Sequence, residues 1–218
     1  MSRFDVCLSL GNVGYFKVME LIQYAPLVEL RMDLLSVSEY EYKSLFSVHS
    51  QIVATSRVRE NNFNELIHNM KMAIDFGCAY IDIDIHVPLL VRDRLFETAK
   101  DNGVKQILSY HNYDLTPSLE DLISIGKEMQ TSKADIVKLA CFANSSDDCV
   151  RVLHLYDQFE NIVAFNMGVK GRITRFLAPF LGSPFIYAAF GDNITAPGQI
   201  AYDEMCAILN QFENSLCL

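Results

Sequence analysis

The chain has 218 residues, of which 50% are hydrophobic and 21% are charged, the balance of an ordinary globular protein with a sizeable core. Its 18 Lys and Arg residues against 27 Asp and Glu residues give a net charge of −9, so we expect no nucleic-acid partner. The longest apolar stretch, 177–191, is broken by two prolines and is too short to span a membrane, and the first residues lack a signal-peptide pattern. We therefore expect a cytoplasmic protein with no membrane segment.

Short apolar runs alternate with longer amphipathic segments along the whole chain. The predicted strands are 4–10, 27–32, 51–56, 80–85, 104–110, 135–141, 161–166 and 185–189. The predicted helices are 15–24, 38–47, 62–76, 89–102, 118–132, 146–159, 170–181 and 198–211. Most of the strand segments are rich in Val, Ile, Leu and aromatic residues, which is typical of strands buried on both faces.

This alternation predicts a parallel sheet, because each helical crossover returns the chain to the same end of the sheet. An open doubly wound sheet is one possibility, but eight repeats within this length favour a (β/α)8 TIM barrel that forms a single domain over residues 1–218. No glycine-rich nucleotide-binding motif follows any predicted strand.

The cysteines are scattered and form neither a CxxC pair nor a cluster with histidines at the spacing of zinc ligands. They are Cys7, Cys78, Cys141, Cys149, Cys206 and Cys217. We expect them to be free thiols, and we expect no structural metal.

Active sites of such barrels lie at the carboxyl ends of the strands, so polar residues there are the candidates for chemistry. Lys138 is the most informative, since it lies within the buried run Ile136–Val137–Lys138–Leu139–Ala140, where an ammonium group is costly to desolvate. A buried lysine loses its proton more readily and can then attack a carbonyl to form a Schiff base. The alternatives are a lysine that reaches solvent and a structural ion pair with Glu29.

His111, at the end of the preceding strand, could supply the base that a Schiff base needs. We expect the other histidines, at 49, 68, 86 and 154, to have structural or surface roles. Asp82 and Asp84 are predicted to be interior carboxylates that balance nearby arginines, with a metal-binding pair as the alternative. Arg175 lies in a helical segment and is either a solvated residue or a partner for a substrate carboxylate.

Several segments together resemble the type I 3-dehydroquinate dehydratase family. In chain order they are CLSL at the first strand, ELRMD (29–33), YHNYDLTPS (110–118), DIVKLA (135–140), MGVKGRITR (167–175), LGS and APGQI. Each is weak alone, but their shared order and spacing over nearly the whole chain are specific. The residue after His111 is Asn112, where the family usually has an aspartate.

The resemblance implies dehydration of 3-dehydroquinate to 3-dehydroshikimate in the shikimate pathway of aromatic amino acid biosynthesis. Lys138 would form an imine with the C3 ketone, and His111 would remove the C2 proton and protonate the departing C1 hydroxyl. Glu60 would orient His111. No metal and no cofactor would be needed, and the enzyme would be a homodimer acting on a small molecule.

The resemblance also implies a set of substrate-binding residues, with a lid formed by the 191–199 loop. They are Ser9, Glu29, Arg31, Arg57, Met167, Arg175, Thr195 and Gln199. Arg57 stands three residues before Glu60 where the family usually has four, so Ser56 is the alternative at that position. Two other functions stay open: another Schiff-base lyase or aldolase, and an inactive barrel that serves as a binding module.

Overall fold

A computed structural model of the chain describes residues 4–58 and 62–216, in which strands and helices alternate as predicted. The strands are β1 (Val6–Leu10), β2 (Leu27–Arg31), β3 (Ile52–Thr55), β4 (Tyr80–Asp84), β5 (Lys105–Asn112), β6 (Ile136–Phe142), β7 (Ile162–Met167) and β8 (Ile186–Ala189). The helices are α1 (Tyr15–Leu21), α2 (Glu39–Val48), α3 (Phe63–Asp75), α4 (Leu89–Asp101), α5 (Leu119–Thr131), α6 (Ser146–Leu153), α7 (Arg172–Leu177) and α8 (Tyr202–Leu216). Two short 3-10 helices, η1 (His154–Asp157) and η2 (Ala178–Leu181), follow α6 and α7.

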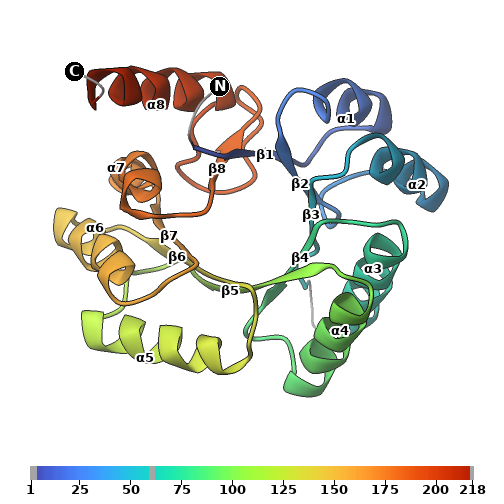
Figure 1. Cartoon of the computed structure of the whole chain (residues 1–218), viewed down its shortest axis with the longest axis horizontal. Helices are drawn as coiled ribbons and strands as arrows, with labels where there is room; N and C mark the ends of the chain where they lie inside the picture. The colour runs from blue at the N-terminus through green and yellow to red at the C-terminus, as the bar shows by residue number, and fades with distance from the viewer. Residues whose placement is uncertain (1–3, 59–61, 217–218) are drawn as a thin grey trace.

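The strands form one parallel sheet in the order β7-β6-β5-β4-β3-β2-β1-β8, which curls into a nearly closed barrel with the helices outside it (Figure 1). β7 and β8 complete the ring without a ladder of their own among the described residues. The rings of Phe165 on β7 and Tyr187 on β8 lie 6.3 Å apart at that seam. The structure is therefore the predicted (β/α)8 TIM barrel.

The helix boundaries follow the local end signals. Ser118 caps α5 by accepting a hydrogen bond from the backbone of Asp121 at 3.2 Å. Gly77 and Gly103, just past α3 and α4, have φ angles of 84° and 71°, the left-handed conformation that commonly ends a helix.

The structure corrects several predicted boundaries. The helix predicted over 146–159 ends at Leu153 and continues as η1, and the one predicted over 170–181 is split into α7 and η2. The last helix begins at Tyr202 rather than at residue 198, because the Gln199 side chain accepts hydrogen bonds from the backbones of Thr195 and Ala196 and holds that segment as a loop. β5 runs two residues further than predicted, since His111 and Asn112 pair with Ala140 and Cys141 of β6.

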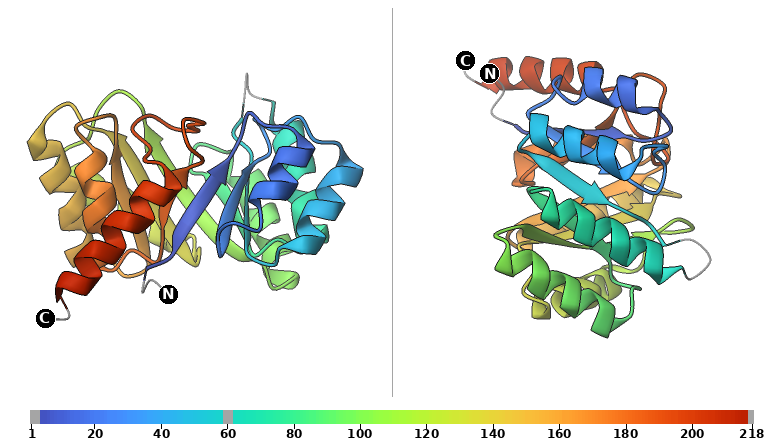
Figure 2. Two further views of the ribbon diagram at one scale, coloured as in Figure 1. Left: turned by 90° about the horizontal axis from the view of Figure 1, so that it is seen from above. Right: turned by 90° about the vertical axis from the view of Figure 1, so that its right-hand side faces the viewer.

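Apolar residues are buried both inside the barrel and between the barrel and its helices, which pack along the outside of the strands (Figure 2). Alternate residues of each strand point inward, and near the amino ends these are apolar, as with Val53, Ile107 and Ile136. Further along the same strands the inward positions become polar. No helix in the described part of the chain is long and apolar enough to cross a membrane.

Candidate active site

Parallel register brings the predicted polar residues into one cavity at the carboxyl end of the barrel. Ser109 pairs with Lys138, and His111 with Ala140, so the two candidate catalytic side chains come from adjacent strands. The predicted site residues that line this cavity are Glu29, Arg31, Arg57, His111, Lys138, Met167, Arg175, Thr195 and Gln199. Ser9 is buried and contacts Glu29 and Thr195 of this lining, and Glu60 is outside the described residues.

Lys138 is held by a carboxylate that it shares with an arginine. Its Nζ donates to Asp82 Oδ2 at 2.9 Å, and Arg57 Nη2 lies 3.0 Å from Asp82 Oδ1. Burial raises the pKa of the Asp82 carboxyl, but Arg57 and then Lys138 outweigh burial and hold that pKa well below its usual range. The ion pair with Glu29, considered from the sequence, is replaced by one with Asp82.

Asp82 receives a further hydrogen bond from the hydroxyl of Ser109, at 2.6 Å, and Arg57 Nη1 donates to the same hydroxyl at 3.0 Å. Asp82 is fully buried and the Lys138 side chain is 5% exposed. Loss of one proton from Lys138 would leave Asp82 paired with Arg57. The amine can therefore be uncharged without leaving an unpaired carboxylate in the barrel.

The ring of Tyr187 lies under the same amine. Lys138 Nζ is 4.0 Å from the ring centroid, a distance at which the face of an aromatic ring attracts a cation. A protonated imine at this nitrogen would carry the same charge over the same ring.

His111 is oriented by a second carboxylate from β4. Its Nδ1 is 2.8 Å from Asp84 Oδ2, so a proton on Nδ1 leaves Nε2 free to accept a proton. Burial lowers the pKa of His111 to about 4, Arg57 adds to this effect, and the hydrogen bond to Asp84 opposes it. The imidazole is therefore neutral near pH 7, which is the form that a general base requires.

A hydrogen-bonded group of side chains joins strands β1 to β3 on the other side of the cavity. Glu29 accepts hydrogen bonds from the hydroxyls of Ser9 and, at 2.8 Å, Thr55. The Ser9 hydroxyl also lies 2.6 Å from that of Thr195. Arg31 forms a two-pronged pair with Asp33 and donates to the carbonyl of Thr195 at 3.1 Å.

Arg175 carries a buried positive charge without a carboxylate partner in the described structure. Its side chain is fully buried and stacks on Phe165, with the guanidinium carbon 4.2 Å from the ring centroid. Nε and Nη1 have no hydrogen-bond partner among the described residues. Burial lowers the pKa of Arg175 to about 9, with a smaller contribution from Arg172. An incoming carboxylate would satisfy these donors, whereas a solvated surface role for Arg175 is wrong.

Of the two candidates that follow β3, Ser56 and Arg57, the structure brings Arg57 into the cavity. Ser56 faces a neighbouring space, where its hydroxyl accepts a hydrogen bond from Asn69 at 3.1 Å. Among the described residues no cluster of three or more His, Cys, Asp or Glu side chains could hold a metal ion.

The sequence indicated only a general charge-balancing role for Asp82 and Asp84, and it did not indicate that Tyr187 lies against the amine of Lys138. The available signal was the alternation of Asp82 and Asp84 on β4, which puts both on the inward face. The sequence motifs also gave no indication that Asp84 contacts the exposed side chain of His86.

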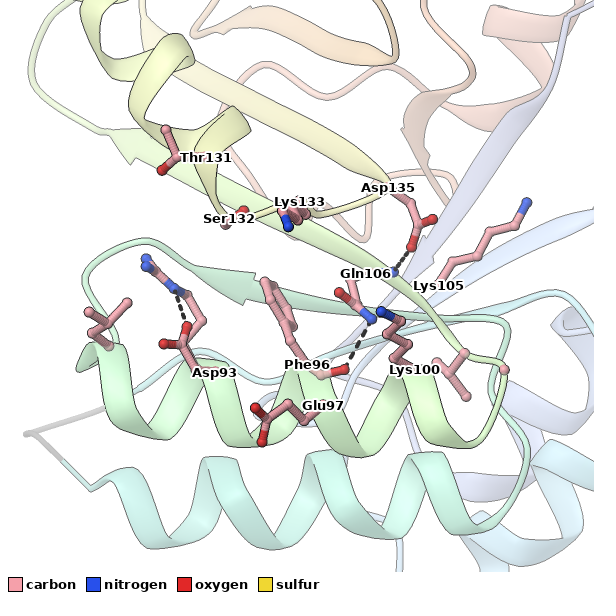
Figure 3. A pocket seen from close by; sticks show the side chains of 14 residues that line it. Asp93, Phe96, Glu97, Lys100, Lys105, Gln106, Thr131, Ser132, Lys133 and Asp135 are labelled. Carbon is pink, nitrogen blue, oxygen red and sulfur yellow. Dashed lines mark hydrogen bonds and ion pairs between the residues drawn. The ribbon is translucent and has the colours of Figure 1, made fainter.

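A wider groove lies outside the barrel and is separate from this cavity. It runs between α4 and the end of α5, where Asp135 accepts a hydrogen bond from the backbone of Gln106 (Figure 3). Lysines 100, 105 and 133 line it together with acidic side chains of Asp93, Glu97 and Asp135. Its mixed charges and lack of a buried nucleophile distinguish it from the cavity that contains Lys138.

Comparison with known proteins gives consistent matches. The family model for type I 3-dehydroquinase matches residues 16–215. The 3-dehydroquinate dehydratase of Pyrococcus abyssi is 34% identical over 192 residues, which cover 85% of this chain and 86% of that protein. The crystal structure of the 3-dehydroquinate dehydratase from Aquifex aeolicus has a TM-score of 0.79 and 26% identity, covering 96% of this chain and 99% of that one. The type I enzyme of Clostridium difficile shares the fold with a TM-score of 0.84 and 20% identity, covering 99% and 94%.

The lowered pKa of His111 makes folding stability depend on pH. Between pH 6.5 and about 4 the unfolded chain binds a proton at this imidazole and the folded protein does not, so the free energy of unfolding falls as the pH drops through that window. The expected loss attributable to His111 is about 3 kcal/mol. Urea unfolding of the wild type and of His111→Asn at several pH values should show a flatter dependence in the variant. An equal slope in both would contradict the prediction, and His154→Gln, at an exposed site, is the control.

Proposed function

The chain belongs to the type I 3-dehydroquinase family, and from that premise we propose which of its residues dehydrate 3-dehydroquinate to 3-dehydroshikimate. The reaction is that of a hydro-lyase of the shikimate pathway. One observation carries the assignment of roles: the buried Lys138 shares one cavity with a neutral His111. The carboxylate that pairs with Lys138, Asp82, is also neutralised by Arg57.

Lys138 is the nucleophile. It gives up one proton and adds to the C3 ketone as a neutral amine. Return of a proton to the hydroxyl of the adduct expels that hydroxyl as water and leaves a protonated imine. Asp82 and the ring of Tyr187 stabilise the positive charge on that nitrogen, as they do for the ammonium group. The imine withdraws electrons from C2 and makes its proton acidic.

His111 is the general base and then the general acid. Nε2 takes the C2 proton, and the electron pair left behind moves toward the imine to form an enamine. The enamine then expels the C1 hydroxyl, which takes the proton from His111 and leaves as water. Hydrolysis of the imine releases 3-dehydroshikimate and the free lysine.

Asp84 holds His111 in the required tautomer through the 2.8 Å contact with Nδ1. Glu60 stays a predicted second partner of His111, since it lies outside the described residues.

The remaining predicted residues bind the substrate. Arg175 pairs with its carboxylate, because it is a buried cation whose Nε and Nη1 donors have no partner among the described residues, while Nη2 donates to the carbonyl of Pro197 at 3.5 Å. The others surround the ring and its hydroxyls: Ser9, Glu29, Arg31, Arg57, Met167, Thr195 and Gln199.

The segment 191–199 acts as the lid. Thr195 forms hydrogen bonds with Ser9, Arg31 and Gln199, so this segment covers the cavity at the carboxyl ends of β1 and β2. The remaining cavity volume is about 30 Å³, enough for only a water molecule or two. Substrate entry therefore requires that these contacts open, and their closure excludes water from the imine.

Reductive trapping tests the role of Lys138. Sodium borohydride added with 3-dehydroquinate should reduce the imine to a stable secondary amine, detected as a mass increase on the peptide that contains Lys138. Lys138→Ala should lose both the adduct and the ultraviolet signal of product formation, whereas Lys133→Ala, at an exposed lysine, should keep both. Product formation without an adduct would refute the imine, and neither adduct nor product in the wild type would indicate a binding module.

Arg175→Met tests the carboxylate contact. Loss of the charge-assisted hydrogen bonds should raise KM about tenfold to a hundredfold. Because the variant also removes a buried charge that has no carboxylate partner among the described residues, its free energy of unfolding should be equal to or above that of the wild type. Steady-state kinetics and urea unfolding measure the two effects, with Arg94→Met, at an exposed site on α4, as the control. An unchanged KM would assign the carboxylate to another residue.

We propose that the protein works as a homodimer. The support from this chain is an exposed apolar surface on α6 and α7, formed by Val150, Ile173 and Leu177 beside the side chain of Leu153. Ile173→Asp should weaken association at least about tenfold, measured by sedimentation, because a desolvated carboxylate has no partner in an apolar interface. Leu90→Asp, at an exposed site on α4, is the matched control. A monomeric wild type would refute the proposal.

We also propose a single catalytic domain that acts in the cytoplasm without a nucleic-acid partner. All eight described strands belong to one sheet, which supports a single domain. The described cysteines, at 7, 78, 141, 149 and 206, are free thiols, which fits a reducing compartment. The net charge of −9 disfavours binding to a phosphate backbone.

A further inference from the structure

His86 lies at the outer end of a chain of contacts that leads to the catalytic imidazole. His86 Nδ1 is 2.7 Å from Asp84 Oδ1, and the other oxygen of the same carboxylate is 2.8 Å from His111 Nδ1. The side chain of His86 is 70% exposed, that of Asp84 is 20% exposed and that of His111 is 10% exposed. One carboxylate thus joins an imidazole in solvent to an imidazole in the cavity.

Two contacts besides the one with the His86 side chain hold Asp84 in place. The backbone N–H of His86 donates to the same Oδ1 at 3.0 Å, and His111 contacts the other oxygen. The imidazole of His86 therefore adds a group that can change its charge next to a carboxylate that is already oriented. In both charge states Nδ1–H can donate to Asp84, because the second proton binds at Nε2.

We propose that His86 is a positioning residue that tunes the basicity of His111 through Asp84. While His86 is neutral, the negative charge of Asp84 stabilises the imidazolium that His111 becomes when it takes the C2 proton. When His86 is protonated, its positive charge offsets that of Asp84 and the same proton transfer becomes slower. This inference rests on the role of His111 as the general base.

Within the described residues, other charged groups face these side chains from the neighbouring strands. Arg57, two residues past the end of β3, faces both Asp84 and His111, and Lys138 from β6 and Asp82 from β4 face His111. Tyr113 stacks on His111 with ring centroids 6.0 Å apart, and Tyr110 contacts the ring of His86 at 5.9 Å. Burial raises the pKa of Asp84, but the hydrogen bond from His111 and the charge of Arg57 lower it to about 2, so Asp84 stays ionised above pH 4.

This arrangement predicts a partial step in the pH profile of turnover. Histidine side chains change charge between pH 5 and 8. In the wild type kcat should fall about twofold to fivefold across this range, the size expected for one exposed charge pair, and then level off. The steeper loss caused by protonation of His111 itself should follow only at lower pH, since burial lowers the pKa of His111 to about 4.

The test compares kcat and KM for 3-dehydroquinate from pH 4.5 to 9 in four proteins. His86→Gln keeps a donor for Asp84 but does not titrate, so the step should vanish and kcat should stay at the upper plateau. His86→Lys carries a charge at every pH in the range and should stay at the lower plateau. His154→Gln removes an exposed histidine that lies 3.8 Å from Asp157 within η1 and should keep the step of the wild type. KM should be unchanged in all variants.

A step that persists in His86→Gln, or a wild type that shows no step, would overturn the inference while leaving the lyase activity intact. A structural role alone would leave the pH profile of His86→Gln identical to that of the wild type, so that result also counts against it. A wild type that neither turns over substrate nor forms the borohydride adduct would overturn the proposed roles of Lys138 and His111, and this inference with them.

Discussion

The site depends on one buried carboxylate, Asp82, which is shared by Arg57 and Lys138. A lysine in the middle of a barrel strand is costly unless its charge is compensated. If Asp82 had Lys138 as its only cation, deprotonating the amine would leave a carboxylate alone in low dielectric. Arg57 removes that cost, because it neutralises Asp82 whether or not Lys138 is charged. The same triad therefore permits both a folded barrel and a reactive amine.

The alternation of side chains along parallel strands then determines which residues meet. Ser9, Glu29, Thr55, Asp82 and Lys138 all occupy inward positions of the barrel. A shift of one residue in any strand would turn its polar group toward the helices and bring apolar residues into the cavity. Fold and chemistry are thus specified by one register, and the apolar inward layer beneath keeps that register in place.

Much of this could be predicted from the sequence. The eight apolar runs predicted the strands to within a few residues, and a lysine in such a run was informative because no packing role accounts for it. The carboxylate partner of Lys138 could not be predicted, because Glu29 and Asp82 both lie on inward faces and only three-dimensional packing decides which reaches the amine. Likewise, spacing along a helix could not reveal that Arg175 is buried, since its burial depends on Phe165 from a strand.

Lys138 and Arg175, the two buried cations of the cavity, differ in whether the protein supplies a carboxylate partner, and this difference bears on function. Lys138 has a protein carboxylate, whereas Arg175 has none among the described residues and a lowered pKa because of burial. A protein carboxylate beside Arg175 would stabilise the empty barrel but would compete with an anionic substrate for the same donors. Leaving the guanidinium without such a partner costs stability in the free protein and turns that cost into binding when a carboxylate enters. At Arg175, therefore, a change that favours folding stability disfavours substrate binding. At Lys138 the protein supplies its own counter-charge, so substrate binding and folding stability are compatible.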